Sequence, residues 1–165
     1  MRLLLIGGGD RGLALTRALA ADGHAVRVVT RDPDRHAAIA AAGGEPYDGD
    51  PDRIGTLRYA LDNVTVLVWA LGSASGDPLA VQALHQTRLE MLLERTIDTT
   101  VRGVLYECNG SLPVELLSQG ARTVERMCRH NEIPWGLLHH DPEDVDGWAA
   151  SAADAVERIL RRERG

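Results

Sequence analysis

A glycine-rich turn directly after the first apolar run constrains the fold of this chain most. Residues 3–6 are Leu-Leu-Leu-Ile, and Gly7, Gly9 and Gly12 follow with the spacing G-x-G-x-x-G before a segment of helical period. Such glycines allow a tight turn, close approach of a ligand to the backbone, and close packing of helix on strand. Free N–H groups at the helix start attract phosphate. The motif predicts a phosphate-binding turn before a helix starting near Leu13; a tight turn without a ligand is the alternative.

Apolar runs of strand length alternate with helix-period segments along the chain. We expect helices between six strands, near residues 2–6, 25–30, 45–48, 64–71, 103–108 and 134–139. This alternation is typical of a parallel sheet covered on both faces, and the continuous apolar run at 64–71 suits a central strand. The sequence predicts an α/β fold with a doubly wound parallel sheet, a three-layer α/β/α Rossmann fold, formed by residues 1–165 as one domain.

Three of the predicted helices have one apolar face each, which we expect to cover the sheet or a partner. The fourth carries Leu89, Leu92, Leu93, Thr96 and Ile97, and the fifth carries Leu117, Ala121, Val124 and Cys128. The last, at about 146–163, carries Trp148, Ala152, Ala155, Val156 and Ile159.

Composition argues against several classes of protein. The chain is 44% hydrophobic and 25% charged, with no apolar run long enough to span a membrane. It enters its first strand without a cleavage site, and Cys108 and Cys128 form neither a zinc motif nor a disulfide framework. The net charge is −6 and the arginines are scattered. We therefore expect a soluble cytoplasmic protein with no membrane or nucleic-acid partner.

The end of the second predicted strand bears on the choice between NAD and NADP. An NAD-preferring site has an acidic residue there, about 20 residues past the glycines, to bind the ribose. This chain has Thr30 and Arg31, and Arg31, with Arg35 or Arg11, can pair a 2′-phosphate bidentately. NADP is therefore the predicted cofactor. In the alternative, Asp32 binds the ribose, Arg31 is a solvated surface charge, and NAD is possible.

Taken together, these residues resemble the atypical NAD(P)H-binding, NmrA-like branch of the short-chain dehydrogenases. The resemblance rests on the order and spacing of segments 7–12, 29–35, 49–51, 60–64, 70–72 and 133–138. It implies a cofactor site made of Gly7, Gly9, Asp10, Arg11, Gly12, Thr30, Arg31, Arg35, Asp50, Pro51, Ala70, Leu71 and Gly72. Within it, Asp50 and Pro51 flank the adenine, unless they form only a turn. Ala70 to Gly72 lie at the middle of the dinucleotide, unless they only end a strand, and the loop 72–77 can cover the cofactor.

The sequence departs from catalytic members of this family in two respects. They resemble one another in a Tyr-x-x-x-Lys pair on the fifth helix, where the lysine lowers the tyrosine pKa. This chain has no lysine, and its segment 120–127 has no tyrosine, although several atypical members also lack the pair. It also stops near the point where such enzymes add a substrate-binding segment. We expect a substrate pocket that is small or shared with a partner subunit.

Other side chains are candidates for chemistry. Asn109 or Ser111 can donate a hydrogen bond near the nicotinamide, or simply cap the helix after Pro113. His139 can shuttle a proton, or be an ordinary loop histidine; His139 and His140 point to opposite faces of a strand, so no metal site is expected. The family also commonly dimerises through the fourth and fifth helices, where Met91 and Leu92 are compatible with a homodimer interface.

Three functional hypotheses follow. The first is an NADPH-dependent oxidoreductase acting on a small or planar acceptor without a Tyr-Lys pair. The second is a non-catalytic dinucleotide-binding redox sensor or scaffold. The third is a regulatory nucleotide-binding domain of a potassium transport system, which usually has an acidic residue where this chain has Thr30 and Arg31.

Overall fold

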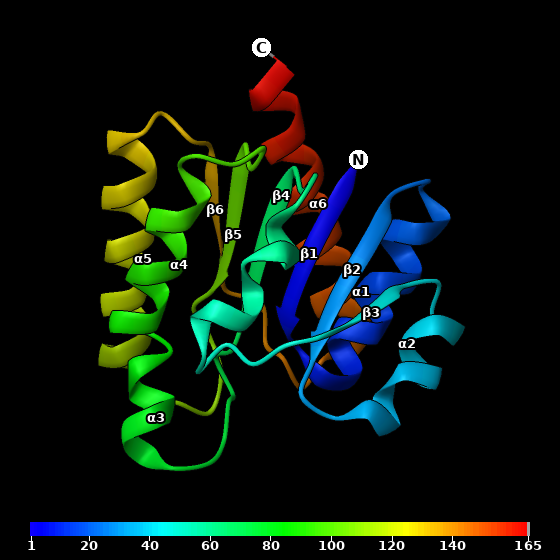
Figure 1. The fold of residues 1–165 in the computed structure, drawn as a ribbon, viewed down its shortest axis with the longest axis horizontal. Helices are drawn as coiled ribbons and strands as arrows, with labels where there is room; N and C mark the ends of the chain where they lie inside the picture. Colours follow the sequence, from blue (N-terminus) through cyan, green and yellow to red (C-terminus); the bar gives the residue numbers. More distant parts are fainter. Residues whose placement is uncertain (165) are drawn as a thin grey trace.

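The computed structural model describes residues 1–164, so Gly165 of the predicted domain lies outside the described residues. Its centre is a parallel six-stranded sheet (Figure 1). In chain order the strands are β1 (Arg2–Gly7), β2 (Ala25–Thr30), β3 (Glu45–Asp48), β4 (Val66–Ala70), β5 (Gly103–Glu107) and β6 (Trp135–Leu138). They lie in the order β3-β2-β1-β4-β5-β6, which is the order of a doubly wound dinucleotide-binding sheet. The predicted fold class is confirmed.

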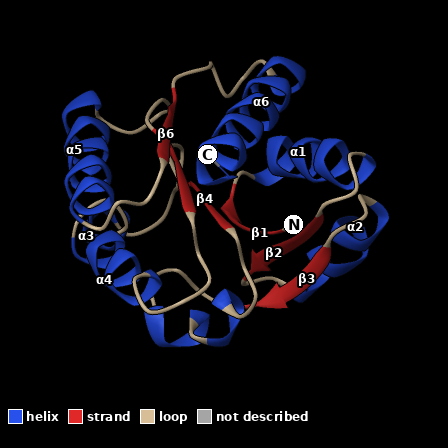
Figure 2. Cartoon of the chain, turned by 90° about the horizontal axis from the view of Figure 1, so that it is seen from above, coloured by secondary structure: helices blue, strands red, loops and turns tan. Residues whose placement is uncertain are grey.

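Helices cover both faces of the sheet (Figure 2). They are α1 (Gly9–Ala21), α2 (His36–Ala41), α3 (Pro78–Ala83), α4 (Thr87–Thr96), α5 (Val114–His130) and α6 (Val145–Arg164). One face carries α1, α2 and α6, and the other carries α3, α4 and α5. Short 3-10 turns at Pro33–Arg35, Ile54–Leu57 and Tyr59–Leu61 complete the connections. Within residues 1–164, no helix has both the length and the apolar character that a membrane span requires.

The core forms two apolar layers, because successive strand residues point to opposite faces of the sheet. In β1, Leu3 and Leu5 pack in the layer under α1 and α6, whereas Leu4 and Ile6 pack in the layer under α4 and α5. All four are at most 1% exposed, as expected for a strand in the middle of the sheet. The apolar face of the last helix is likewise buried, from Trp148 to Ile159.

The structure corrects several element predictions. The first helix begins at Gly9 rather than near Leu13, because the amide of Gly12 already donates to the carbonyl of Gly8. Ile97 lies beyond the end of α4 and is 42% exposed, so it does not belong to the apolar face of that helix. The connection between β3 and β4 consists of 3-10 turns instead of a helix.

The short helix α3 was not predicted. Asp77 caps it by accepting a hydrogen bond from the amide of Ala80, and Pro78 occupies its first turn. An Asp-Pro pair of this kind is a helix-start signal, because proline fits the first turn, where its missing N–H is not needed. The helix lies directly after the loop 72–77 and forms one wall of the cavity described below.

Candidate functional site

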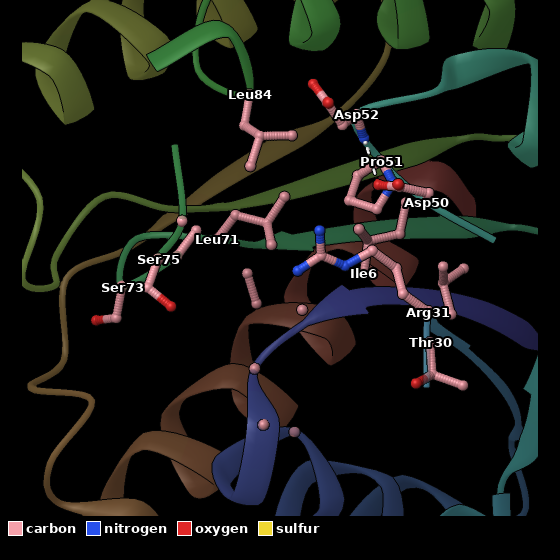
Figure 3. A pocket seen from close by; sticks show the side chains of 18 of the residues that line it. Ile6, Thr30, Arg31, Asp50, Pro51, Asp52, Leu71, Ser73, Ser75 and Leu84 are labelled. Carbon is pink, nitrogen blue, oxygen red and sulfur yellow. Dashed lines mark hydrogen bonds between the residues drawn. The ribbon is translucent and has the colours of Figure 1, made fainter. Parts of the chain in front are cut away.

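A cavity of about 720 Å³ opens at the carboxyl edge of the sheet (Figure 3). It lies between β1 and β4, where the strand order reverses and the chain leaves the two strands in opposite directions. Its walls come from the glycine turn, the end of β2, the segment 49–52, the end of β4 with the loop after it, and α3. Ligands of doubly wound sheets bind at this topological switch point. The predicted covering loop contributes Ser73 to Asp77 to the lining.

The glycine turn presents backbone amides to this cavity. Gly8 precedes α1 with a φ of 93°, and the first helical hydrogen bond runs from the Gly12 amide to the Gly8 carbonyl, at 3.1 Å. The amides of Gly9, Asp10 and Arg11 therefore have no acceptor within the helix. A Cβ on Gly9 would meet no atom within 4 Å, so the backbone there is open to an approaching ligand. These features fit a group that binds through a phosphate or pyrophosphate.

Gly12 has a packing role that differs from that of Gly9. A Cβ on it would lie 3.0 Å from the carbonyl oxygen of Gly7 and 3.2 Å from a methyl group of Leu5. The helix consequently packs directly on β1, and its amino end is held against the carboxyl edge of the sheet.

Two arginines line the cavity beyond the end of β2. Arg31 extends from the strand end into the cavity, beside Asp50 and Pro51 (Figure 3), and Arg35 follows from the 3-10 turn. Among the residues whose side chains the structure describes, neither guanidinium forms an ion pair. The carboxylate of Asp32, by contrast, accepts a hydrogen bond from the amide of Asp34 at 2.9 Å and caps the 3-10 turn.

The segment 49–52, which lies beside Arg31, is held in place by hydrogen bonds to nearby residues. Asp50 accepts a hydrogen bond from the amide of Asp52 at 2.9 Å, and Thr56 bonds the backbone of Asp50. Arg88 at the start of α4 donates to the carbonyl of Asp52 at 2.8 Å. The predicted adenine-flanking pair, Asp50 and Pro51, is therefore part of a fixed turn that lines the cavity.

Arg11 also lines the cavity, but its guanidinium is held by a buried carboxylate. Its Nε and Nη2 donate to the two oxygens of Glu107 at 3.0 and 2.7 Å, and its Nη1 donates to the carbonyl of Gly8. The side chain of Glu107 is 0% exposed and that of Arg11 is 14% exposed. Glu107 also accepts hydrogen bonds from the amide of Gly72 and from Nε1 of Trp148, both at 2.8 Å.

A second buried polar pair supports the wall at the end of β4. His85 is 0% exposed, and its Nε2 lies 2.8 Å from the carbonyl oxygen of Leu71. Since that oxygen can only accept, Nε2 carries a proton, and Nδ1 accepts from the hydroxyl of Tyr106 at 2.6 Å. Burial lowers the pKa of His85 below its ordinary 6.5, against opposing effects of the Leu71 carbonyl and Glu107. A pKa lowered in this way favours the neutral imidazole at neutral pH.

This histidine should make stability depend on pH. Because its pKa is lower in the folded than in the unfolded protein, the unfolded state takes up the extra proton, and the free energy of unfolding should fall as pH drops below 6.5. The slope from this group is at most about 1.4 kcal/mol per pH unit. Urea unfolding from neutral pH to about pH 5 measures it. His85→Gln should flatten the profile, whereas His130→Gln, at an exposed position on α5, should retain the wild-type slope.

The three predicted catalytic residues, Asn109, Ser111 and His139, are not among the residues that line the cavity. Asn109 donates its side-chain amide to the carbonyl of His139 at 2.9 Å, and the backbone amide of Ser111 donates to the hydroxyl of Ser73 at 3.1 Å. His139 is exposed, with its Nδ1 3.2 Å from the sulfur of Cys108. Burial raises the pKa of Cys108 to about 11, which keeps it a neutral thiol.

Most of the predicted cofactor residues are brought together by the fold. The cavity is lined by Gly7, Gly9, Arg11, Gly12, Thr30, Arg31, Arg35, Asp50, Pro51, Ala70 and Leu71. Asp10 is exposed on the first turn of α1, and Gly72 is buried at the start of the loop after β4 (residues 72–77, the β4 loop); neither is among the lining residues. Their roles, like those of the lining residues, stay predictions.

The proposed dimer residues have different environments. Met91 is 39% exposed on α4, but Leu92 is 0% exposed and packs in the core layer beneath that helix. Leu92 therefore cannot contribute to an interface between subunits, because it is already covered within the monomer. The dimer itself stays a prediction.

The sequence motifs do not indicate that Glu107, His85 and Trp148 support the site. A charged residue ending the otherwise apolar strand β5 is the one local signal for Glu107, since a buried charge needs a partner. Its partners on α1 and α6 come from distant parts of the chain. Within the described residues no cluster of three or more His, Cys, Asp or Glu side chains is arranged to hold a metal ion.

The strand order, the glycine turn and the cavity define a dinucleotide-binding Rossmann domain. The model of an NAD(P)H-binding family matches residues 7–139, so the chain belongs to that family. The predicted resemblance to the NmrA-like, atypical short-chain dehydrogenases is confirmed. Comparison with curated protein sequences gives no match.

Solved structures share this fold at low sequence identity. BdcA from E. coli superposes with a TM-score of 0.72 and 13% identity, over 92% of this chain and 88% of its own. Triphenylmethane reductase from Citrobacter sp., complexed with NADP(H), superposes with a TM-score of 0.62 and 19% identity, over 85% of this chain and 49% of its own. An NADPH-dependent quinone oxidoreductase from E. coli superposes with a TM-score of 0.59 and 19% identity, over 84% of this chain and 46% of its own. The chain spans about half the length of the two reductases.

Proposed function

We propose that this chain binds NADP(H) across the carboxyl edge of its sheet and presents the nicotinamide to a small or planar acceptor. The observation that carries this proposal is the pairing of two features in one cavity. Backbone amides at the start of α1 have no helical acceptor, and two arginines without an ion-pair partner among the described side chains stand beyond β2. The first feature suits a pyrophosphate and the second suits a 2′-phosphate.

The engagement of Asp32 supports NADP over NAD. An NAD site has a carboxylate that lines the cavity and accepts from the ribose hydroxyls. Here one oxygen of Asp32 caps the 3-10 turn and the residue is absent from the cavity lining, whereas Arg31 and Arg35 line it. Because Arg11 is held by Glu107, we assign the 2′-phosphate to Arg31 and Arg35 alone.

Replacing Arg31 tests this assignment. Arg31→Ala should weaken NADPH binding roughly ten- to hundredfold, because a hydrogen bond to a charged group contributes about 1.5–3 kcal/mol. NADH carries no 2′-phosphate, so its affinity should stay unchanged. Calorimetric titration with both nucleotides measures the change, and Arg122→Ala on the exposed side of α5 is the matched control. An equal loss for both nucleotides would contradict the assignment.

The cavity lining bears on the kind of acceptor. When bound, a reduced nicotinamide supplies a hydride. The titratable side chains among the lining residues are Arg11, Arg31, Arg35, Asp50, Asp52 and Asp77. Arginine stays charged, and the set includes no tyrosine, histidine or cysteine to act as an acid near neutral pH. We therefore propose acceptors such as quinones or flavins, which take the hydride at the site and the accompanying proton from water.

The lack of a lining side chain to act as an acid near neutral pH also favours a second candidate, a dinucleotide-binding sensor or scaffold without catalysis. Turnover distinguishes the two candidates. Reduced-nicotinamide absorbance is followed with the purified protein and NADPH, with a quinone, a free flavin or a triphenylmethane dye added in turn. Acceptor-dependent oxidation above the protein-free rate supports the reductase, and saturable NADPH binding without oxidation by any acceptor supports the sensor.

A further inference from the structure

Glu107 joins two elements that line the cavity to a third, α6, that does not line it. One of its oxygens accepts from Nη2 of Arg11 and from the amide of Gly72, and the other accepts from Nε of Arg11 and from Trp148. Arg11 is in the first turn of α1, Gly72 follows β4, and Trp148 lies on α6. A single carboxylate thus connects the glycine turn with the β4 loop across the switch point, and with the helix behind them.

We propose that Glu107 is a positioning residue for the pyrophosphate of the bound dinucleotide, an inference that rests on the proposed cofactor site. By fixing Arg11 and Gly72 to one carboxylate, it sets the distance between the glycine turn and the β4 loop before the ligand arrives. A site ordered in advance binds more tightly, because the ligand does not have to immobilise it. The side chain of Glu107 is not in the cavity lining, so it acts only through the groups that it holds.

The packing around Gly72 leaves little freedom in this arrangement. A Cβ on Gly72 would lie 2.9 Å from a carboxylate oxygen of Glu107 and would overlap the carbonyl oxygen of Asn109. The β4 loop therefore lies directly on the carboxylate, with no side chain between them. A side chain at position 107 that is shorter, or that has only one acceptor oxygen, would lose the hydrogen bond from Gly72 or those from Arg11.

The charge balance supports the same role. A fully buried carboxylate near the phosphate site would repel the anionic ligand if it were unpaired. Arg11 lies between them, since it both lines the cavity and forms the ion pair with Glu107. Its guanidinium also donates to the Gly8 carbonyl at the turn itself, and lies 5.2 Å from the ring centre of Trp148. Holding Arg11 in this way leaves the free backbone amides of the turn to bind the phosphates.

The test compares two ligands on one variant. Glu107→Gln keeps the side-chain size but replaces one acceptor oxygen with a donor and removes the charge. It should weaken NADPH and NADH binding alike, by roughly tenfold, because both carry the pyrophosphate. Adenosine 2′-monophosphate has the ribose phosphate without the pyrophosphate, so its affinity should be unchanged. Glu125→Gln, which disrupts the exposed pair with Arg129 on α5, is the matched control and should bind as wild type.

Each outcome separates this inference from the proposed cofactor site. If wild type binds NADPH and the variant binds it equally well, Glu107 has no positioning role. If the affinity for adenosine 2′-monophosphate falls as much as the affinity for NADPH, the substitution has disturbed the structure in general and the inference is wrong. If wild type binds neither dinucleotide, the cofactor site itself fails. Should Glu107→Gln not fold, Glu107→Asp retains the charge with a shorter reach, and the same pattern of losses is expected.

Discussion

Replacing Arg11 with methionine should lower the free energy of unfolding by about 3–5 kcal/mol, measured by urea denaturation without nucleotide. The substitution removes the only cation paired with Glu107 among the described side chains and leaves a carboxylate with a fully buried side chain uncompensated. Breaking a buried ion pair on one side is far more costly than losing an exposed one. The effect is expected although Arg11 lies in the first turn of α1, within the glycine-rich motif, which by itself indicates no buried ion pair.

Two further variants identify the cause of that loss. Arg129→Met removes the exposed pair with Glu125 and should cost at most about 1 kcal/mol. The double variant Arg11→Met/Glu107→Gln leaves no unpaired charge and should recover part of the lost stability. If the free energy of unfolding of Arg11→Met lies within about 1 kcal/mol of the wild-type value, the ion pair between Arg11 and Glu107 is not a buried structural link.

Gly9→Ala should weaken NADPH binding roughly hundredfold, because a Cβ there projects from the turn whose free amides would hold the pyrophosphate. Losing two hydrogen bonds to a charged group accounts for an effect of that size. Stability should fall much less, by about 1 kcal/mol, from the alanine in a left-handed backbone of φ +51°. Calorimetric titration and urea unfolding of the same preparation separate the two effects.

Gly23 offers a matched control for this substitution. It has a φ of +89° and, like Gly9, no atom within 4 Å of an added Cβ, but it follows α1 at the opposite edge of the sheet. Gly23→Ala should lower stability by a similar amount and leave NADPH affinity at the wild-type value. A Gly9→Ala protein that binds NADPH as tightly as this control would show that the ligand does not approach the turn.

The fold was largely predictable because its signals are local. Apolar strand runs, helical periods and the glycine turn each lie within a short stretch of sequence, and together they predict the parallel sheet. The errors have local causes too. The glycine motif indicates a turn over Gly9 to Gly12, but these residues already form the first turn of α1. The apolar period includes Ile97, although α4 ends at Thr96.

The candidate site was predictable only in part, because some of its bonds join residues far apart in the sequence. The pattern alone made Arg11 a possible phosphate ligand, and its pairing with Glu107, 96 residues away, appears only in the folded chain. His85 and Tyr106 illustrate the same point, since nothing in either segment indicates that the two side chains meet beneath Leu71. Motifs identify where backbone contacts a ligand; the side chains that hold that backbone in place come from the tertiary structure.

The central claim is that the cavity at the carboxyl edge of the sheet binds a nicotinamide dinucleotide. Calorimetric titration of the wild-type protein with NADPH, followed by NADH, tests it most directly. We predict saturable binding of one NADPH per chain, with weaker binding of NADH. Absence of saturable binding by either nucleotide, in a protein shown to be folded by its urea transition, would contradict it.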